Sequence, residues 1–394
     1  MASTTTSQSV ASSPLQHLSY QQLDILHALR GFCAFYVVIF HARYILWAGG
    51  RQYLEAFPRS TWKASDYGVF LLDMLSSAGH EMVLFFFVLS GFFIRYSQQR
   101  KQRTTASFYL NRITRIYPPF LFSALLAVIT LYILAYQVPS IFTTGNGREL
   151  NQSLTGAWAE LKALRISTIT NTLAFLRADQ YFIGYNTVYW SLLPEALFYL
   201  CVPFVLRIPR FYYGSSAALF LVGLFLNYKG IELSLLANYG LKYNFYFALG
   251  AALHDTAIYT MWLKQIKAVP KRLLLSLLLG LSTALVGTSI MKYGSLPDLL
   301  AATLAIFTIS ILLTGRVIRT NPLIKLFHFI GVYSFSLYLY HYPLLLLSYG
   351  LIVKATGQLI IYNHLYWLVL PFIMAACYGL YWITERVAIQ YFRK

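Results

Sequence analysis

Long apolar runs recur along the whole chain, and short polar stretches separate them. A run of about 20 apolar residues is long enough for a helix to cross a lipid bilayer. About ten runs approach this length, so the pattern predicts an all-α polytopic membrane protein with about ten transmembrane helices. The predicted spans lie near residues 26–47, 78–96, 117–137, 187–206, 213–229, 239–258, 273–291, 298–314, 329–350 and 364–384.

The composition supports this class, because 58% of the 394 residues are hydrophobic and 11% are charged. Soluble domains have about 45–50% apolar and about 25% charged residues. The formal net charge is +18, but the basic residues lie between apolar runs and form no single patch. We therefore expect a lipid bilayer, and not nucleic acid, as a partner. The three cysteines, Cys33, Cys201 and Cys377, lie inside apolar runs without a paired motif, so no disulfide and no metal site are expected.

Basic residues mark one set of loops. Cytoplasmic loops of membrane proteins carry an excess of Lys and Arg. We expect ten spans with both termini in the cytoplasm, because this topology places the loops rich in Lys and Arg on the cytoplasmic side. More than half of the 31 basic residues lie in these loops and in the C-terminal tail. They are Arg95, Arg100, Lys101, Arg103, Arg112, Arg115, Arg207, Arg210, Lys264, Lys267, Lys271, Arg272, Arg316, Arg319, Lys325, Arg386, Arg393 and Lys394.

The first 22 residues are rich in Ser, Thr and Gln and lack the basic start of a signal peptide. We expect residues 1–22 to be a disordered cytoplasmic tail and residues 23–394 to form one transmembrane domain. The longest segment outside the spans, residues 138–186, is expected on the extracytoplasmic side. It carries Trp158, Leu161, Leu164 and Ile166 at helical spacing and is predicted to form an amphipathic helix at the membrane interface.

Ionisable side chains inside spans are costly and indicate function by default. Arg30 and His41 lie on the first span, Glu195 on the fourth and His341 on the ninth. Arg30 and His41 are separated by roughly 16 Å along a helix, so Arg30 is expected at the cytoplasmic face. His41, His341 and Glu195 are expected at similar depth, where they could act as acids and bases. Equally, the histidines could be ordinary core residues, and Glu195 could simply hold helices together.

Five short motifs occur in order between residues 23 and 386. They are Leu29-Arg30-Gly31 followed by His41; the run from Leu84 to Phe92, which includes Ser90; Arg112 to Pro118; Trp190-Ser191-Leu192 with Glu195 and Tyr199; and Tyr333 to Pro343, which includes Ser336 and His341. In this order they resemble the membrane-bound acyltransferase 3 family, which includes bacterial O-acetyltransferases of cell-surface polysaccharides.

The resemblance implies transfer of an acyl group, usually acetyl from acetyl-CoA, to a hydroxyl group of an extracytoplasmic glycan or glycolipid. The family's arginine and catalytic histidine map onto Arg30 and His41. Its basic motif maps onto Arg112 and Arg115, which we expect to bind the phosphates of acyl-CoA at the start of a helix fixed by Pro118-Pro119. Glu195 is the expected catalytic carboxylate. The other candidates for the site are Ser90, Trp190, Tyr199, Ser336 and His341.

A neutral His41 could deprotonate the acceptor hydroxyl, or it could first accept the acyl group as an acyl-imidazole. No tightly bound cofactor is expected, and acyl-CoA is the donor substrate. The expected location is a bacterial inner membrane. Two other functions fit part of the pattern: a secondary transporter, which also has many spans and intramembrane charges, and an acyltransferase of the same family that modifies a small molecule or a lipid. Arg112 and Arg115 could also be topology signals without a binding role.

Overall fold

A computed structural model describes residues 18–47, 51–101, 103–142, 148–255, 257–317 and 320–391. All regular structure in these ranges is helical, so the predicted all-α polytopic fold is confirmed. Residues 1–17, which form most of the expected N-terminal tail, lie outside the described residues, as do Arg319, Arg393 and Lys394.

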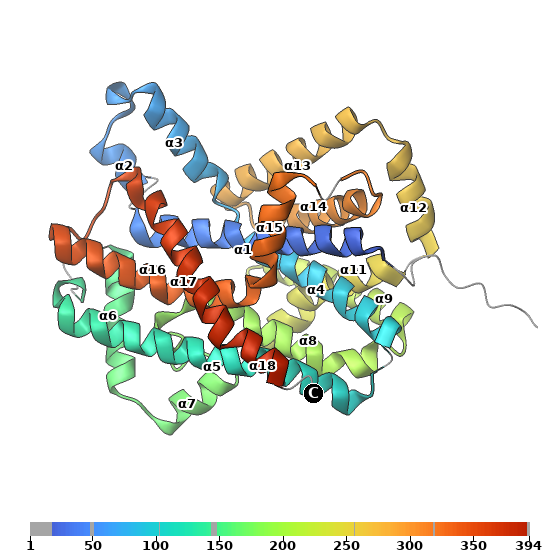
Figure 1. Ribbon diagram of the computed structural model, residues 1–394, viewed down its shortest axis with the longest axis horizontal. Coiled ribbons are helices and arrows are strands. Elements are labelled where there is room, and N and C mark those ends of the chain that lie inside the picture. The colour runs from blue at the N-terminus through green and yellow to red at the C-terminus, as the bar shows by residue number, and fades with distance from the viewer. Residues whose placement is uncertain are drawn as a thin grey trace, which may run out of the picture.

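Helices of very different length make up the fold (Figure 1). Their bounds are α1 Tyr20–Leu46, α2 Arg51–Ala56, α3 Ala64–Leu75, α4 Gly79–Lys101, α5 Thr105–Gln137, α6 Glu149–Lys162, α7 Ile166–Leu173, α8 Leu192–Val205, α9 Pro209–Tyr228, α10 Leu235–Asn238, α11 Asn244–Asp255, α12 Ala257–Ala268, α13 Lys271–Met291, α14 Leu296–Leu313, α15 Pro322–Val332, α16 Ser334–Thr356, α17 Leu370–Ile383 and α18 Glu385–Tyr391.

Within the described part of the chain, 9 helical segments are long and apolar enough to cross a membrane. They coincide with nine of the predicted spans. The remaining prediction, residues 239–258, corresponds to a π-helical turn at Tyr239–Tyr243 followed by α11. Helix α11 has only 12 residues, and the segment contains the polar residues Lys242, Asn244 and Asp255, so it is shorter and less apolar than the other spans.

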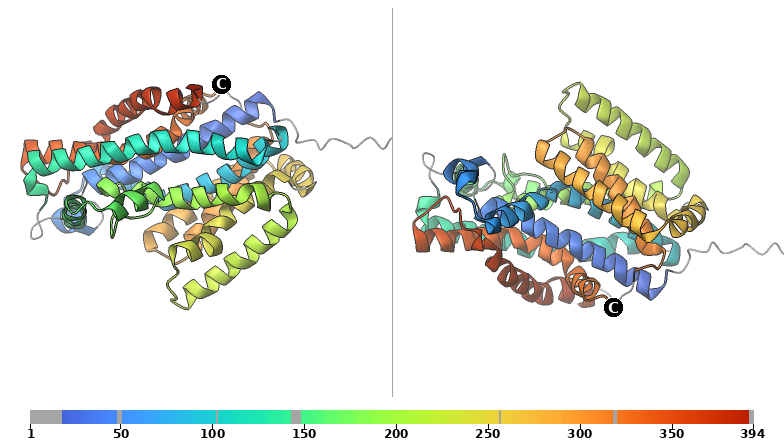
Figure 2. Two further views of the ribbon diagram at one scale, coloured as in Figure 1. Left: turned by 90° about the horizontal axis from the view of Figure 1, so that it is seen from below. Right: turned by 90° about the horizontal axis from the view of Figure 1, so that it is seen from above.

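Helix α4 lies between two groups of helices, packing against α1 on one side and against α11 and α14 on the other. In both views of Figure 2, α17 lies on one side of the molecule and α9, α13 and α14 lie on the opposite side. Gly91 of α4 and Gly250 of α11 allow these two helices to approach closely, because a Cβ atom at either position would collide with the backbone of the facing helix. The predicted packing role of the Ser90-Gly91 motif is consistent with this contact.

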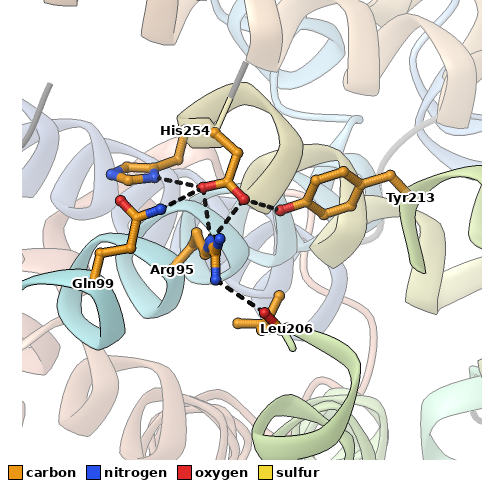
Figure 3. A network of polar contacts seen from close by, with 6 residues as sticks. Arg95, Gln99, Leu206, Tyr213 and His254 are labelled. Atoms are coloured by element: carbon orange, nitrogen blue, oxygen red, sulfur yellow. Dashed lines mark hydrogen bonds and ion pairs between the residues drawn. The ribbon is translucent and has the colours of Figure 1, made fainter. Parts of the chain in front are cut away.

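A network of polar contacts joins the ends of α4, α9 and α11 (Figure 3). Arg95 Nε donates to both carboxylate oxygens of Asp255, at 2.7 Å each. Gln99 Nε2, one turn further along α4, donates to Asp255 Oδ1 at 2.9 Å, and the Tyr213 hydroxyl donates to Asp255 Oδ2 at 2.7 Å. Arg95 Nη1 also donates to the Leu206 carbonyl at 3.2 Å, so the Arg95 charge is paired with Asp255 and joins α4 to α8 and α11.

Helix α5 begins twelve residues earlier than the sequence suggested. Thr104 caps it by accepting a hydrogen bond from Ser107 N, and the helix runs to Gln137 with Pro118 and Pro119 in its interior. The prediction that the prolines fix the helix start is therefore wrong. A threonine N-cap satisfies one of the free amide groups of the first turn, whereas an interior proline removes one backbone hydrogen bond without necessarily ending a long helix.

The described part of the segment 138–186 forms two α-helices, α6 and α7, and two short 3-10 helices at Pro139–Ile141 and Ile183–Tyr185, instead of the single helix expected. Leu154 and Leu161 are buried on one face of α6, in agreement with the amphipathic pattern, whereas Leu164 and Ile166 are exposed beyond its end. The turn at Ala163–Arg165 divides the predicted helix, because Arg165 has an extended backbone conformation that starts α7 anew.

Candidate functional site

A cavity of about 340 Å³ lies between α1, α4, α5, α8 and α16, and we call it the arginine cavity. Arg30 of α1 and Arg112 and Arg115 of α5 all line it, together with apolar side chains from α4 such as Phe86 and Phe93. From the sequence, these arginines were expected at the same membrane face, but the distances between them were not predicted. The structure brings all three into one cavity.

The arginines retain free hydrogen-bond donors. Arg30 donates one long bond of 3.4 Å to the Ser334 hydroxyl. The Arg112 guanidinium packs over the rings of Phe108 and Tyr199, at 5.4 and 5.2 Å from the ring centres, and its buried Nε has no hydrogen-bond partner. Among the described residues, none of the three cavity arginines is in an ion pair with a carboxylate. Three cations with unused planar donors form a site suited to phosphate groups.

Glu195 lies in the arginine cavity, on the first turn of α8. It accepts a hydrogen bond from Tyr199, one helical turn further on, and the Tyr199 hydroxyl is also 3.4 Å from the Ser90 hydroxyl. The carboxylate of Glu195 therefore lies in the arginine cavity, and among the described residues it makes no hydrogen bond to either predicted histidine. Tyr199 and Ser90, both predicted site residues, belong to the cavity as well.

The two predicted histidines are in direct contact. His41 Nδ1 of α1 lies 2.9 Å from His341 Nε2 of α16, although 300 residues separate them in the chain. The rings are tilted by 30° with their centres 5.1 Å apart. His341 is completely buried, whereas His41 is half-buried. A buried histidine pair of this kind can hold a proton at a defined nitrogen.

Hydrogen bonding fixes the direction of donation in this pair. His341 Nδ1 lies 2.9 Å from the carbonyl oxygen of Leu337, which can only accept, so Nδ1 carries the proton. In a neutral ring Nε2 of His341 is then an acceptor, and His41 Nδ1 must donate to it. The Nε2 atom of His41 is left unprotonated. It can therefore act as a base or as a nucleophile.

Two aromatic rings pack against His41 in addition to His341. Phe40 and Tyr342 lie edge-on to its ring, with centre distances of 5.2 and 5.1 Å. Tyr185 in turn packs edge-on against Tyr342 and has a left-handed backbone with φ of 57°, directly after Gly184 at 62°. Left-handed backbone is unusual for a tyrosine, and such strain tends to occur at functional sites.

The arginine cavity and the histidine pair share the helices α1 and α16. On α16, Ser334 and Tyr338 line the cavity, and His341 is three residues beyond Tyr338, with ring centres 6.1 Å apart. The Tyr338 hydroxyl lies 2.8 Å from the Ser191 hydroxyl at the inner end of the cavity. On α1, Arg30 and His41 are separated by roughly 16 Å along the axis.

Two further predicted residues lie outside both groups. The Ser336 hydroxyl donates to the buried Glu385 at 2.7 Å, so it holds α16 to α18. Trp190 stacks on His80 with ring centres 4.9 Å apart and contacts Tyr243 of the π-helical turn that precedes α11. Neither Ser336 nor Trp190 lines the arginine cavity.

The cavity also includes residues that the sequence did not single out, namely His27, Ser334 and Tyr338. His27 precedes Arg30 by three residues, and Ser334, Tyr338 and His341 are spaced by four and three. Residues three or four apart share one face of a helix. A search for polar residues three or four positions away from each predicted residue, on the same face of its helix, would have found His27, Ser334 and Tyr338.

No group of three or more His, Cys, Asp or Glu side chains among the described residues could hold a metal ion. The groups present are cationic donors at one place and a neutral histidine pair at another. They suit binding of an anionic substrate and transfer of a proton.

Comparison with protein families gives one match. Residues 23–384 match the family described as "Acyltransferase domain", which is the membrane acyltransferase 3 family. No curated protein and no solved structure matches the chain significantly.

Proposed function

Because that match covers nearly the whole chain, the protein belongs to the membrane acyltransferase 3 family, and we propose that it moves a short acyl group from acyl-CoA to a hydroxyl group of an extracytoplasmic glycan or glycolipid. Acyltransferase activity follows from family membership, as does location in a membrane that the chain crosses several times. The donor, the acceptor, the side of the membrane and a bacterial inner membrane are the proposed details.

One observation carries the proposal: a cavity with three arginines is joined to a histidine pair through the same two helices, α1 and α16. Acyl-CoA has phosphate groups at one end and a thioester at the end of a long, thin arm. Arg30, Arg112 and Arg115 would bind the phosphates through charge-assisted hydrogen bonds. The arm would extend along α1 and α16 toward His41.

The histidine pair supports a balanced reaction. The acceptor hydroxyl oxygen attacks the thioester carbon while His41 Nε2 takes the hydroxyl proton. The carbon–sulfur bond breaks, and the thiolate leaves with that proton as free CoA. His341 stabilises the charged ring through the hydrogen bond from His41 Nδ1. If His41 Nε2 attacks the thioester carbon first, the carbon–sulfur bond breaks, CoA leaves as the thiolate and an acyl-imidazolium forms. The acceptor hydroxyl then attacks the acyl carbon, the bond to Nε2 breaks, and the hydroxyl proton goes to the CoA thiolate, which regenerates neutral His41.

Family membership favours an enzyme over the secondary transporter that the sequence also allowed. An acyltransferase that modifies a small molecule or a lipid remains the second candidate, since the motifs are common to the family. The acceptor distinguishes these two candidates.

The direct test uses the purified protein in lipid nanodiscs with radiolabelled acetyl-CoA and a panel of oligosaccharides, glycolipids and lipids. Released CoA thiol and labelled product are both measured. The proposal expects label in an oligosaccharide or glycolipid, in an amount equal to the CoA released. Label in a lipid without sugar would establish the second candidate. If wild type released no more CoA than a His41→Ala variant with any of the acceptors, the proposed reaction would be contradicted.

A further inference from the structure

A second cavity, of about 380 Å³, lies between the end of α9, α10, the π-helical turn Tyr239–Tyr243 and the start of α14, and it shares no lining residue with the arginine cavity. Its volume is within the range of about 300–1,000 Å³ that small-molecule sites have. The end of α9, the segment that follows it and the start of α14 form its lining, including Asn227, Glu232 and Asp298. We call it the amide cavity.

Ionisable side chains meet beside this cavity. Lys242 Nζ lies 2.7 Å from Asp298 Oδ2, and His80 Nε2 lies 3.7 Å from Asp298 Oδ1. Next to His80, Glu81 accepts a hydrogen bond of 2.9 Å from Ser289. Asp298 is only 5% exposed. Charged groups inside membrane helices are costly and usually serve a function, and the proposed acyl transfer does not use these.

The polar groups of the amide cavity suit a neutral ligand with hydroxyl groups. The Asn227 amide nitrogen donates to the Ser295 hydroxyl at 2.9 Å, and that of Asn238 donates to a backbone carbonyl at 3.1 Å. These bonds use the amide nitrogens, so each amide oxygen can accept a hydrogen bond from a ligand, while Lys242 has further N–H donors beyond the one that binds Asp298. The charges of Lys242 and Asp298 cancel, and the carboxylate of Glu232, which also lines the cavity, disfavours an anionic ligand and can accept hydrogen bonds from hydroxyl groups.

Contacts link this cavity to the catalytic histidine. Gly79 packs directly against the ring of Phe40, and Phe40 lies edge-on to His41. His80, the next residue of α4, contacts Asp298 in the lining of the amide cavity. The amide cavity is therefore at the same end of the helices as His41, away from the three arginines.

We propose that the amide cavity binds a sugar unit of the acyl acceptor, next to the unit whose hydroxyl group reacts at His41. This inference rests on the proposed function, because it assigns the acceptor side of the same reaction. Asn227, Asn238 and Lys242 hydrogen-bond the hydroxyl groups of that sugar. The cavity thereby favours acceptors with two or more sugar units over single hydroxyl compounds.

The test compares Ser295→Trp, which places a large ring in the cavity, with Ser295→Ala, which removes only a hydroxyl. Binding of maltopentaose and chitopentaose to the proteins in nanodiscs is measured at equilibrium, without acetyl-CoA. We expect wild type and Ser295→Ala to bind at least one of the two, and Ser295→Trp to bind it at least tenfold more weakly. A second variant, Asn238→Ala, should weaken binding by roughly three- to tenfold, as the loss of one hydrogen bond does.

Kinetics separate this inference from the proposed function. The Ser295→Trp variant should show a raised KM for the pentasaccharide, with an unchanged KM for acetyl-CoA and an unchanged rate with glycerol as acceptor. Equal pentasaccharide affinity in wild type and Ser295→Trp, or no binding of either sugar to wild type, would overturn the acceptor site and leave acyl transfer intact. A third outcome is that no hydroxyl compound causes CoA release, although the protein binds a pentasaccharide and Ser295→Trp weakens that binding. This outcome would overturn the proposed function and not the sugar site.

Discussion

His41 Nδ1 lies 2.9 Å from His341 Nε2, and this contact joins the first transmembrane helix to α16. The Leu337 carbonyl fixes the proton on the far nitrogen of His341. The contact thus orients the ring of His41 and leaves its Nε2 unprotonated. His41 is the residue that would react, and His341 positions it.

His41→Ala is expected to lower acyl transfer by about 10²–10⁴-fold, the usual contribution of a general base. Membrane expression should stay near normal, because one half-buried ring contributes little to a fold with many packed helices. Turnover of purified protein and its thermal stability are measured together. Recovery of more than a tenth of wild-type turnover would remove His41 as the base.

His341→Gln should lose less activity than His341→Leu, because a glutamine oxygen can still accept the hydrogen bond from His41 Nδ1 whereas leucine cannot. The expected kcat is highest for wild type, lower for His341→Gln and lowest for His341→Leu. The KM for acetyl-CoA should be nearly the same in all three proteins. Equal activity of the Gln and Leu variants would show that His341 acts through packing and not through the hydrogen bond.

Asp255→Ala should destabilise the protein by about 3 kcal/mol, because it leaves the Arg95 charge without its partner. Asp255 and Arg95 are both largely buried, and Tyr213 also loses its acceptor. Thermal unfolding in detergent measures the effect. The double variant Arg95→Met/Asp255→Leu removes both charges and should recover much of the lost stability, so a double variant no better than Asp255→Ala would contradict the ion-pair explanation.

Much of the fold followed from the length of the apolar runs, because only a helix satisfies its own backbone hydrogen bonds in lipid. The exceptions have local causes. The Thr104 cap starts α5 before its prolines, and polar residues make the segment with Lys242 less apolar than a typical span.

The site was predictable only in part. His41 and His341 stood out because a charged or polar ring inside a span is rare. Their pairing was not predictable, since depth along a helix does not say which face points to which neighbour. Glu195 was expected beside them from its depth alone, yet it faces the arginine cavity. Arg30 likewise groups with Arg112 and Arg115, which come from another helix.

Asp73 gives a prediction for pH dependence. Burial raises the pKa of its carboxyl group from 3.8 to about 6, against the lowering effects of the hydrogen bond from Tyr366 and the charge of Arg43. An acid whose pKa is raised by folding favours the folded state when protonated. The protonated carboxyl group of Asp73 therefore gives its full stabilisation of the folded state below about pH 3.8. This stabilisation is lost as the pH rises through about 6.

Asparagine cannot ionise, so Asp73→Asn should keep the stability that wild type loses when Asp73 ionises. That loss of folding free energy is at most about 3 kcal/mol. We expect a higher melting temperature than wild type at pH 7.5 and a similar one at pH 4. Asp179→Asn, which changes an exposed carboxylate, is the matched control and should follow wild type at both values. A variant with the same pH profile as wild type would show that Asp73 is not the titrating group.

The predicted orientation can be tested with single cysteines in a background where Cys33, Cys201 and Cys377 are replaced by alanine. Ser60 precedes α3 and Thr104 caps α5, and both are exposed. Ser60→Cys should react with an impermeant thiol reagent from outside intact cells, and Thr104→Cys only after lysis. Labelling of Thr104→Cys from outside would reverse the orientation and place the arginine cavity away from cytoplasmic acyl-CoA.

The double variant Arg112→Lys/Arg115→Lys tests whether these arginines bind the donor or only set the topology. Lysine keeps the positive charge that orients the chain, but it lacks the planar fork that binds a phosphate through two hydrogen bonds. The donor-site interpretation expects a KM for acetyl-CoA raised by at least tenfold, since each weakened charge-assisted bond costs about 1.5–3 kcal/mol. The acceptor KM should change little. Arg210→Lys, on the first turn of α9 and outside the cavity, is the control. If the double variant and this control have the same acetyl-CoA KM as wild type, the two arginines serve topology alone.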